Sequence, residues 1–136
     1  MLSPSAESVR LTVHVLAAAV WVGGQIVLGG IVPTLRRTAP DAVRPVARAF
    51  ARVSWPAFGV VVLTGIWNIT ALSLGGQSSD YQTTAMVHVL LAVVTGISAA
   101  GHSLGRSKVA IALGGAIGLL SAIAALYVGV LLSSVD

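Results

Sequence analysis

Three histidines are the side chains of this sequence best suited to chemistry. His14 and His88 lie inside long apolar stretches, and His102 lies near the end of one. A neutral imidazole nitrogen binds haem iron or copper, and it can also simply hydrogen-bond to a neighbouring helix. Because ionisable groups inside membrane spans are costly, they often mark functional sites. The histidines are therefore candidates for a cofactor site, with interhelical packing as the alternative.

Composition limits the kind of site that these histidines can form. The 136 residues include no cysteine, which excludes disulfides, thiolate metal ligands and covalent c-type haem attachment. Hydrophobic residues make up 56% and charged residues 9% of the chain, so we expect it to lie in a lipid bilayer as a single transmembrane domain, 1–136. The net charge of +4 comes from too few and too localised basic residues for a nucleic-acid surface, so no nucleic-acid partner is expected.

Four apolar stretches are each about long enough to cross a membrane as a helix. They predict an all-α, integral membrane four-helix bundle with short connections. The predicted spans are about 11–35, 53–74, 81–104 and 109–132.

The basic residues predict the orientation of these spans. Most of them lie in the first and third connections, and Arg10 alone lies on the other side. The positive-inside rule then places the connections between helices 1 and 2 and between helices 3 and 4 in the cytoplasm, with both termini outside. The expected location is a plasma membrane of prokaryotic type, crossed several times. The basic residues of the two connections are Arg36, Arg37, Arg44, Arg48, Arg52, Arg106 and Lys108.

The segment 38–52 has a pattern of its own. Arg44, Arg48 and Arg52 recur every four residues, which predicts a short amphipathic interfacial helix between the first two spans. Contact with anionic lipid headgroups is the favoured role, and a clamp for phosphate or substrate is the alternative.

Pairs of small residues allow two helices to approach closely. Gly101 and Gly105 form one such pair, and Gly114 and Gly118 form another. The spacing permits packing within the bundle or between protomers of a homo-oligomer, and both interpretations stay open.

The predicted topology places His14 and His88 at a shared depth. Helices 1 and 3 both run inward from the outer side, and each histidine lies one to two turns from the outer end. Small residues on the same helix faces leave room for a flat or bulky group. For Trp67 an interfacial aromatic belt is an equal alternative. The predicted pocket residues are Trp21, Trp67, Asn68 and Ala92.

Two imidazoles at one depth suit a six-coordinate haem b, with iron bound by His14 and His88 and the macrocycle packed by apolar side chains. Copper is the alternative, for which Met86 is a poor co-ligand because residues i and i+2 point to different sides of a helix. The sequence thus predicts a membrane haem protein that acts in electron transfer or redox sensing with a redox partner.

Two motifs carry a family resemblance. One is the run His14-Val-Leu-Ala-Ala-Ala-Val-Trp21-Val-Gly23-Gly24, and the other is Thr64-Gly65-Ile66-Trp67-Asn68. The run that begins at His14 resembles the opening helix of the copper-resistance D (CopD) family and of HemJ-type protoporphyrinogen oxidases. The run that begins at Thr64 is similar to the Thr-Gly-containing helix two of CopD-like domains.

The resemblance implies a function for each family. For CopD-like proteins it implies copper uptake or tolerance, and for HemJ-type proteins it implies bound haem b and oxidation of protoporphyrinogen. By resemblance, His14 and His88 are the ligand positions. HemJ-type proteins typically have a lysine shortly after the helix-three histidine, and this chain has Leu90 there, which weakens the enzymatic interpretation.

Overall fold

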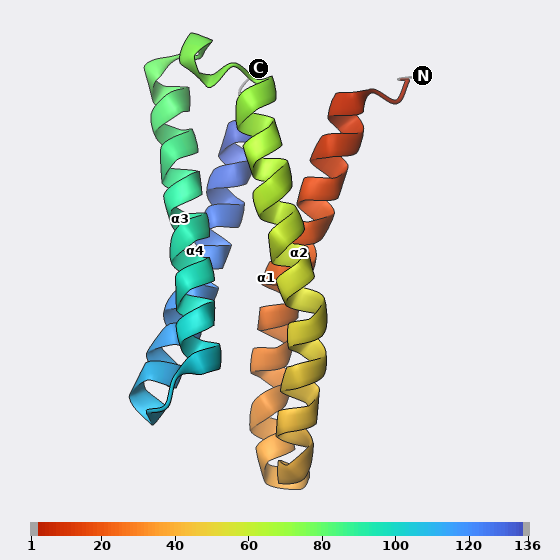
Figure 1. Cartoon of the computed structure of the whole chain (residues 1–136), viewed down its shortest axis with the longest axis vertical. Coiled ribbons are helices and arrows are strands. Elements are labelled where there is room, and N and C mark those ends of the chain that lie inside the picture. Colours follow the sequence, from red (N-terminus) through yellow and green to blue (C-terminus); the bar gives the residue numbers. More distant parts are fainter. Residues whose placement is uncertain (1–2, 135–136) are drawn as a thin grey trace. The chain divides into compact units, whose positions relative to one another are not determined.

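The computed structural model describes residues 3–134, and within that range the chain is helical, without a β-strand. The four long helices are each long and apolar enough to cross a membrane, which confirms the all-α prediction and is compatible with several membrane spans. They are α1 (Ala6–Thr38), α2 (Val43–Ala71), α3 (Ser79–Leu104) and α4 (Lys108–Ser133), with short 3₁₀ turns η1 (Pro40–Ala42) and η2 (Leu74–Gly76) in two of the connections (Figure 1).

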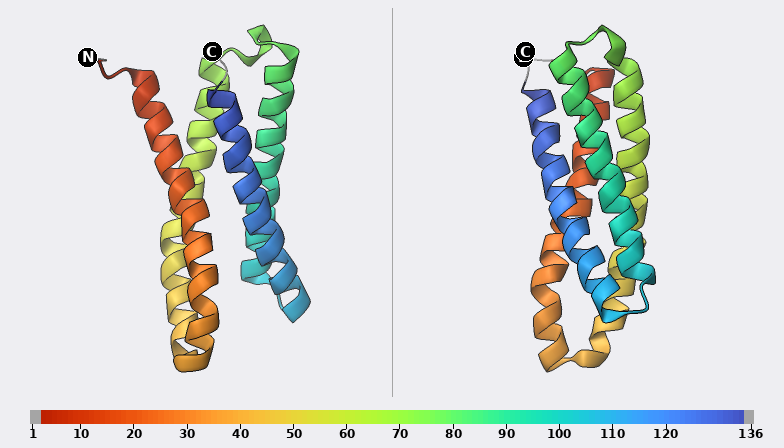
Figure 2. Two further views of the ribbon diagram at one scale, coloured as in Figure 1. Left: turned by 180° about the vertical axis from the view of Figure 1, so that it is seen from behind. Right: turned by 90° about the vertical axis from the view of Figure 1, so that its left-hand side faces the viewer.

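The chain divides into two compact units, Met1–Leu72 and Ser73–Asp136. In the first unit α1 packs against α2, and in the second α3 packs against α4 (Figure 2). Each unit is an antiparallel helical hairpin, so the start of its first helix lies beside the end of its second. This arrangement brings residues that are far apart in the sequence to one level of each hairpin.

Serine side chains fix where three of the helices begin. Ser5 and Ser8 form a reciprocal capping box at the start of α1, at 3.1 and 2.9 Å. Ser78 accepts a hydrogen bond from the backbone of Tyr81 in α3, and Ser107 accepts one from Ala110 in α4. These bonds satisfy backbone N–H groups that have no partner inside the helix. All three helices therefore begin at positions that the local sequence specifies.

The separate interfacial helix predicted for 38–52 is wrong. After the turn η1, α2 runs from Val43 to Ala71 without a break, so the arginine-rich segment is its first part. The helix also continues through Pro56, which has no N–H for the carbonyl of Arg52, so neither the polarity of the segment nor this proline ends it. Arg44, Arg48 and Arg52 lie on this extension, where they form a basic face.

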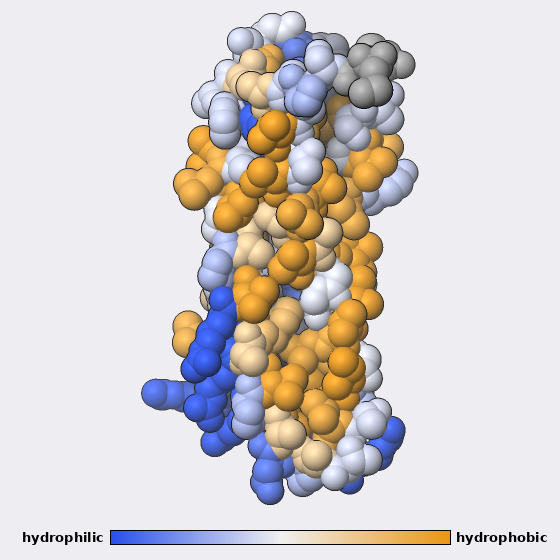
Figure 3. Space-filling view, turned by 90° about the vertical axis from the view of Figure 1, so that its right-hand side faces the viewer, coloured by the Kyte–Doolittle hydropathy of each residue, from blue (hydrophilic) through white to orange (hydrophobic). Residues whose placement is uncertain are grey.

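The exposed surface of the helices is mostly apolar. Large side chains such as Leu63 and Leu120 are about two-thirds exposed, at 70% and 67%. On the face seen in Figure 3, hydrophobic side chains cover most of the length and hydrophilic ones gather toward its lower end. Such a surface is stable in lipid and would aggregate in water.

Small residues let α3 and α4 approach closely. A Cβ added at Gly114 would lie 2.8 Å from the backbone nitrogen of His102 and 2.8 Å from the backbone oxygen of Ser98. One turn further along α4, Thr95 donates a hydrogen bond of 2.8 Å to the carbonyl of Gly118. The glycine pair in α4 therefore serves packing inside this hairpin, which was one of the two interpretations that its spacing allowed.

Candidate functional site

His14 is held in one orientation by a threonine of the neighbouring helix. Its Nδ1 lies 2.7 Å from Oγ1 of Thr64 in α2. The threonine hydroxyl lies 2.6 Å from the carbonyl of Val60 and 3.2 Å from that of Val61, and with its proton on either one the threonine oxygen accepts from Nδ1–H. The ring also packs against Gly65, where an added Cβ would lie 3.6 Å from Cε1. The neutral imidazole consequently carries its lone pair on Nε2.

His88 is held by the backbone of α4. Its Nδ1 lies 2.9 Å from the carbonyl oxygen of Ala125, and a carbonyl can only accept a hydrogen bond. Nδ1 is therefore the protonated nitrogen of the neutral ring. A Cβ added at Gly129 would lie 3.2 Å from Cε1 and 3.5 Å from Nδ1, so glycine makes the space that the imidazole fills. His88 thus has the same tautomer as His14.

The shared tautomer is the arrangement that metal-binding histidines use. A ligating imidazole commonly donates its other N–H to a protein oxygen, which fixes the ring and makes the ligating nitrogen more basic. Both histidines are half-buried and both donate through Nδ1. Each hairpin therefore presents one imidazole with Nε2 as the basic nitrogen.

His102 has a similar bond in a different setting. Its Nδ1 lies 2.6 Å from the carbonyl of Ile111, and the side chain is exposed. A Cβ added at Gly115 would lie 2.9 Å from the same nitrogen. The bond joins the end of α3 to the first turns of α4, which favours a structural role at the tight connection.

Trp21 lies in an aromatic cluster of the first hairpin. Only 4% of its surface is exposed, and its ring lies 4.5 Å from that of Phe58 and 5.6 Å from that of Trp55, measured between centroids. Both partners belong to α2. Trp21 therefore packs α1 against α2 along the face that also carries His14 and the buried Ala17.

Trp67 contacts a charged residue that the span prediction left outside the apolar stretch. Arg10 lies within α1 and is 8% exposed, and its guanidinium carbon lies 5.9 Å from the centre of the Trp67 ring. The Nε of Arg10 and the Oδ1 of Asn68 are buried atoms without a hydrogen-bond partner. Trp67 itself is 55% exposed.

The remaining predicted site residues lie in α3. Ala92 is half-buried one turn after His88, where its small side chain leaves space on that face. Met86 is exposed. Within residues 3–134, no group of three or more histidine, cysteine or acidic side chains is placed to hold a metal ion.

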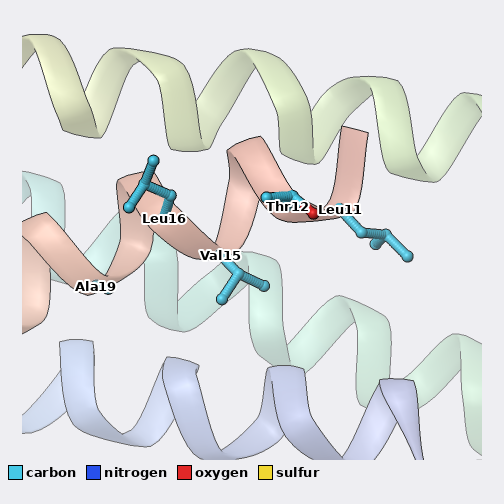
Figure 4. A pocket seen from close by; sticks show the side chains of 5 residues that line it. All are labelled: Leu11, Thr12, Val15, Leu16 and Ala19. Atoms are coloured by element: carbon cyan, nitrogen blue, oxygen red, sulfur yellow. The ribbon is translucent and has the colours of Figure 1, made fainter. Parts of the chain in front are cut away.

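Two surface depressions among residues 3–134 have no histidine in their lining. One is a shallow apolar hollow on α1, shown in Figure 4. Its lining residues are Leu11, Thr12, Val15, Leu16 and Ala19. The other lies where α3 begins and α4 ends, and Asp80 and Tyr81 are among its lining residues.

Comparison of the chain with protein-family models, with curated proteins and with solved structures gives no match. The family resemblance inferred from the first two helices therefore stays a prediction.

Proposed function

We propose that the chain is an integral membrane protein that binds one haem b through His14 and His88 and acts in electron transfer or redox sensing. When bound, haem b ligated by two imidazoles supplies reversible one-electron chemistry at iron. The side chains of this protein would hold the group, exclude water from it and set its potential.

The matching hydrogen bonds of the two histidines carry this proposal. The same kind of bond occurs at His102, which is exposed and has a structural role, so the bond counts together with the position of His14 and His88 inside apolar helices. Here two histidines, on different helices and with different acceptors, both donate through Nδ1. Nε2 is the nitrogen that projects furthest from the helix, and it is left as the basic one in both cases.

The surroundings of the histidines also fit a porphyrin. Haem provides four ligands of its own, so the protein needs to supply only two. Glycine and alanine lie next to the imidazoles, with Gly65 beside His14 and Ala92 one turn from His88. Small neighbours allow a flat macrocycle to approach its ligands.

An absorption spectrum of the protein purified in detergent and supplied with haem tests the proposal. We expect a Soret band and sharp α and β bands on reduction, typical of bis-imidazole haem. Metal analysis of the same sample tests for copper. Stoichiometric copper without porphyrin, or no spectrum after haem supplementation, would contradict the proposal.

We also propose that both termini and the α2–α3 connection face the outside of a plasma membrane of prokaryotic type. The basic residues of the other two connections support this orientation. Because the chain has no cysteine, single cysteines report sidedness directly. In intact cells, an impermeant maleimide should label the exposed Gly75→Cys and should label Thr38→Cys only after lysis. The reverse pattern would show an inverted protein.

A further inference from the structure

Arg10 is a buried cation with an incomplete set of partners. Arginine has five N–H donors, and its Nε–H here is buried without an acceptor. The contact identified for its charge is with the ring of Trp67. No acidic side chain within residues 3–134 forms an ion pair with it.

A cation in this situation is costly unless something compensates for it. Burying the Nε–H of a guanidinium without an acceptor is unfavourable, and a cation–π contact replaces only part of the lost hydration. Buried polar groups that lack a partner in a protein often meet one in a ligand. The most economical partner for an unpaired guanidinium is an oxyanion, which accepts charge-assisted hydrogen bonds from it.

Asn68 adds another unsatisfied group at this place. It follows Trp67 directly in α2, and its buried Oδ1 has no partner. Rotation of the side-chain amide by half a turn exchanges its oxygen for its NH₂ group. The NH₂ group would then donate to the same acceptor as Arg10. Arg10 of α1 and Asn68 of α2 would thus each offer a donor within one hairpin.

Arg10 and Asn68 each lie one helical turn from the contact between His14 and Thr64. Arg10 precedes His14 by four residues on α1, and Asn68 follows Thr64 by four residues on α2, so both pairs share a helix face. The rise between the two levels is about 6 Å. An acidic group attached to a flat ligand bound at His14 would reach across that distance toward the start of α1.

We propose that Arg10, assisted by Asn68, binds a carboxylate of the porphyrin, namely a propionate of the haem that His14 ligates. The inference rests on the proposed haem-binding function and adds the group that orients the porphyrin edge. The same donors could hold a lipid phosphate, which shares the chemistry of an oxyanion, so the test separates these two sources.

The test compares iron protoporphyrin IX with its dimethyl ester, which has no carboxylate, in titrations followed at the Soret band. Arg10→Gln should weaken binding of the free acid about tenfold to a hundredfold, the loss of a charge-assisted hydrogen bond. Binding of the ester should not change. Arg48→Gln removes an arginine of the basic face in the same hairpin and should behave as the wild type for both porphyrins.

Four outcomes would overturn the inference. Equal weakening of acid and ester by Arg10→Gln would show that the arginine acts through packing. Unchanged binding of the acid would show that it does not meet a propionate. Reduced retention of an anionic phospholipid, with an unchanged ratio of acid to ester affinity, would assign the site to lipid.

The fourth outcome is a wild-type protein that binds neither porphyrin, which would contradict the proposed function itself. It is distinguishable from failure of the Arg10 inference because it is seen without any variant. If Arg10→Gln does not fold, Asn68→Leu provides the same comparison. We expect Asn68→Leu to weaken binding of the free acid, but not of the ester, by a smaller factor than Arg10→Gln. An unchanged ratio of acid to ester affinity would again contradict the inference.

Discussion

His14→Ala and His88→Ala are each expected to abolish the low-spin haem spectrum, whereas His102→Ala leaves it intact. Loss of either imidazole leaves five ligands at most, so the sharp reduced α band should disappear even where some haem is retained. His102 is the matched control because its Nδ1 also donates to a carbonyl, yet it lies exposed at the α3–α4 connection. Spectra of the three reduced variants at equal protein concentration make the comparison.

Two further measurements sharpen this prediction. Free imidazole should restore the low-spin spectrum in an alanine variant that keeps its fold, because it can occupy the vacated ligand position. Thr64→Val removes the hydroxyl that fixes His14 while preserving the side-chain shape, and it should weaken haem binding about 10–100-fold. A normal spectrum in both alanine variants would mean that the two histidines serve only to pack helices.

Gly114→Val is expected to lower the free energy of unfolding by about 1–3 kcal/mol or more, the range for overpacked sites. Even its first added carbon would lie 2.8 Å from backbone atoms of both Ser98 and His102. Backbone cannot rotate away as a flexible side chain can, so α3 and α4 must separate. Denaturation in mixed micelles, followed by circular dichroism, measures the change.

Gly101→Ala is the control for that variant. Gly101 lies on α3 in the same hairpin, and an added Cβ there would meet nothing within 4 Å. The stability of this variant should equal or slightly exceed that of the wild type, since alanine favours a helix more than glycine does. Equal destabilisation by the two substitutions would mean that Gly114 lacks the tight contact described here.

The helices were predictable from sequence because hydropathy and capping residues act locally. The third and fourth predicted spans differ from α3 and α4 by two residues or fewer at each end. The error at α2 has an equally local origin. The basic segment was separated from the second span by polarity, but helix formation depends on backbone hydrogen bonds, and α2 continues through both the arginines and Pro56.

The partners of the histidines could not be predicted in the same way. Thr64 in an apolar helix has the pattern of a residue that bonds only to its own backbone, and its contact with His14 depends on the register of α1 against α2. The acceptor for His88 is a backbone carbonyl, which every residue possesses. Arg10 was missed as a candidate because the predicted first span begins at Leu11, one residue after it. The shared depth of His14 and His88 stays a prediction.

The hydrogen bonds of His14 and His88 each close within a single hairpin. Residues 1–72 leave the ribosome first, so His14 can adopt its final tautomer and rotamer before His88 has been synthesised. Each histidine is thus oriented by its own hairpin alone. If haem b binds as proposed, it meets two imidazoles that were oriented independently, and its release would leave both hairpins folded.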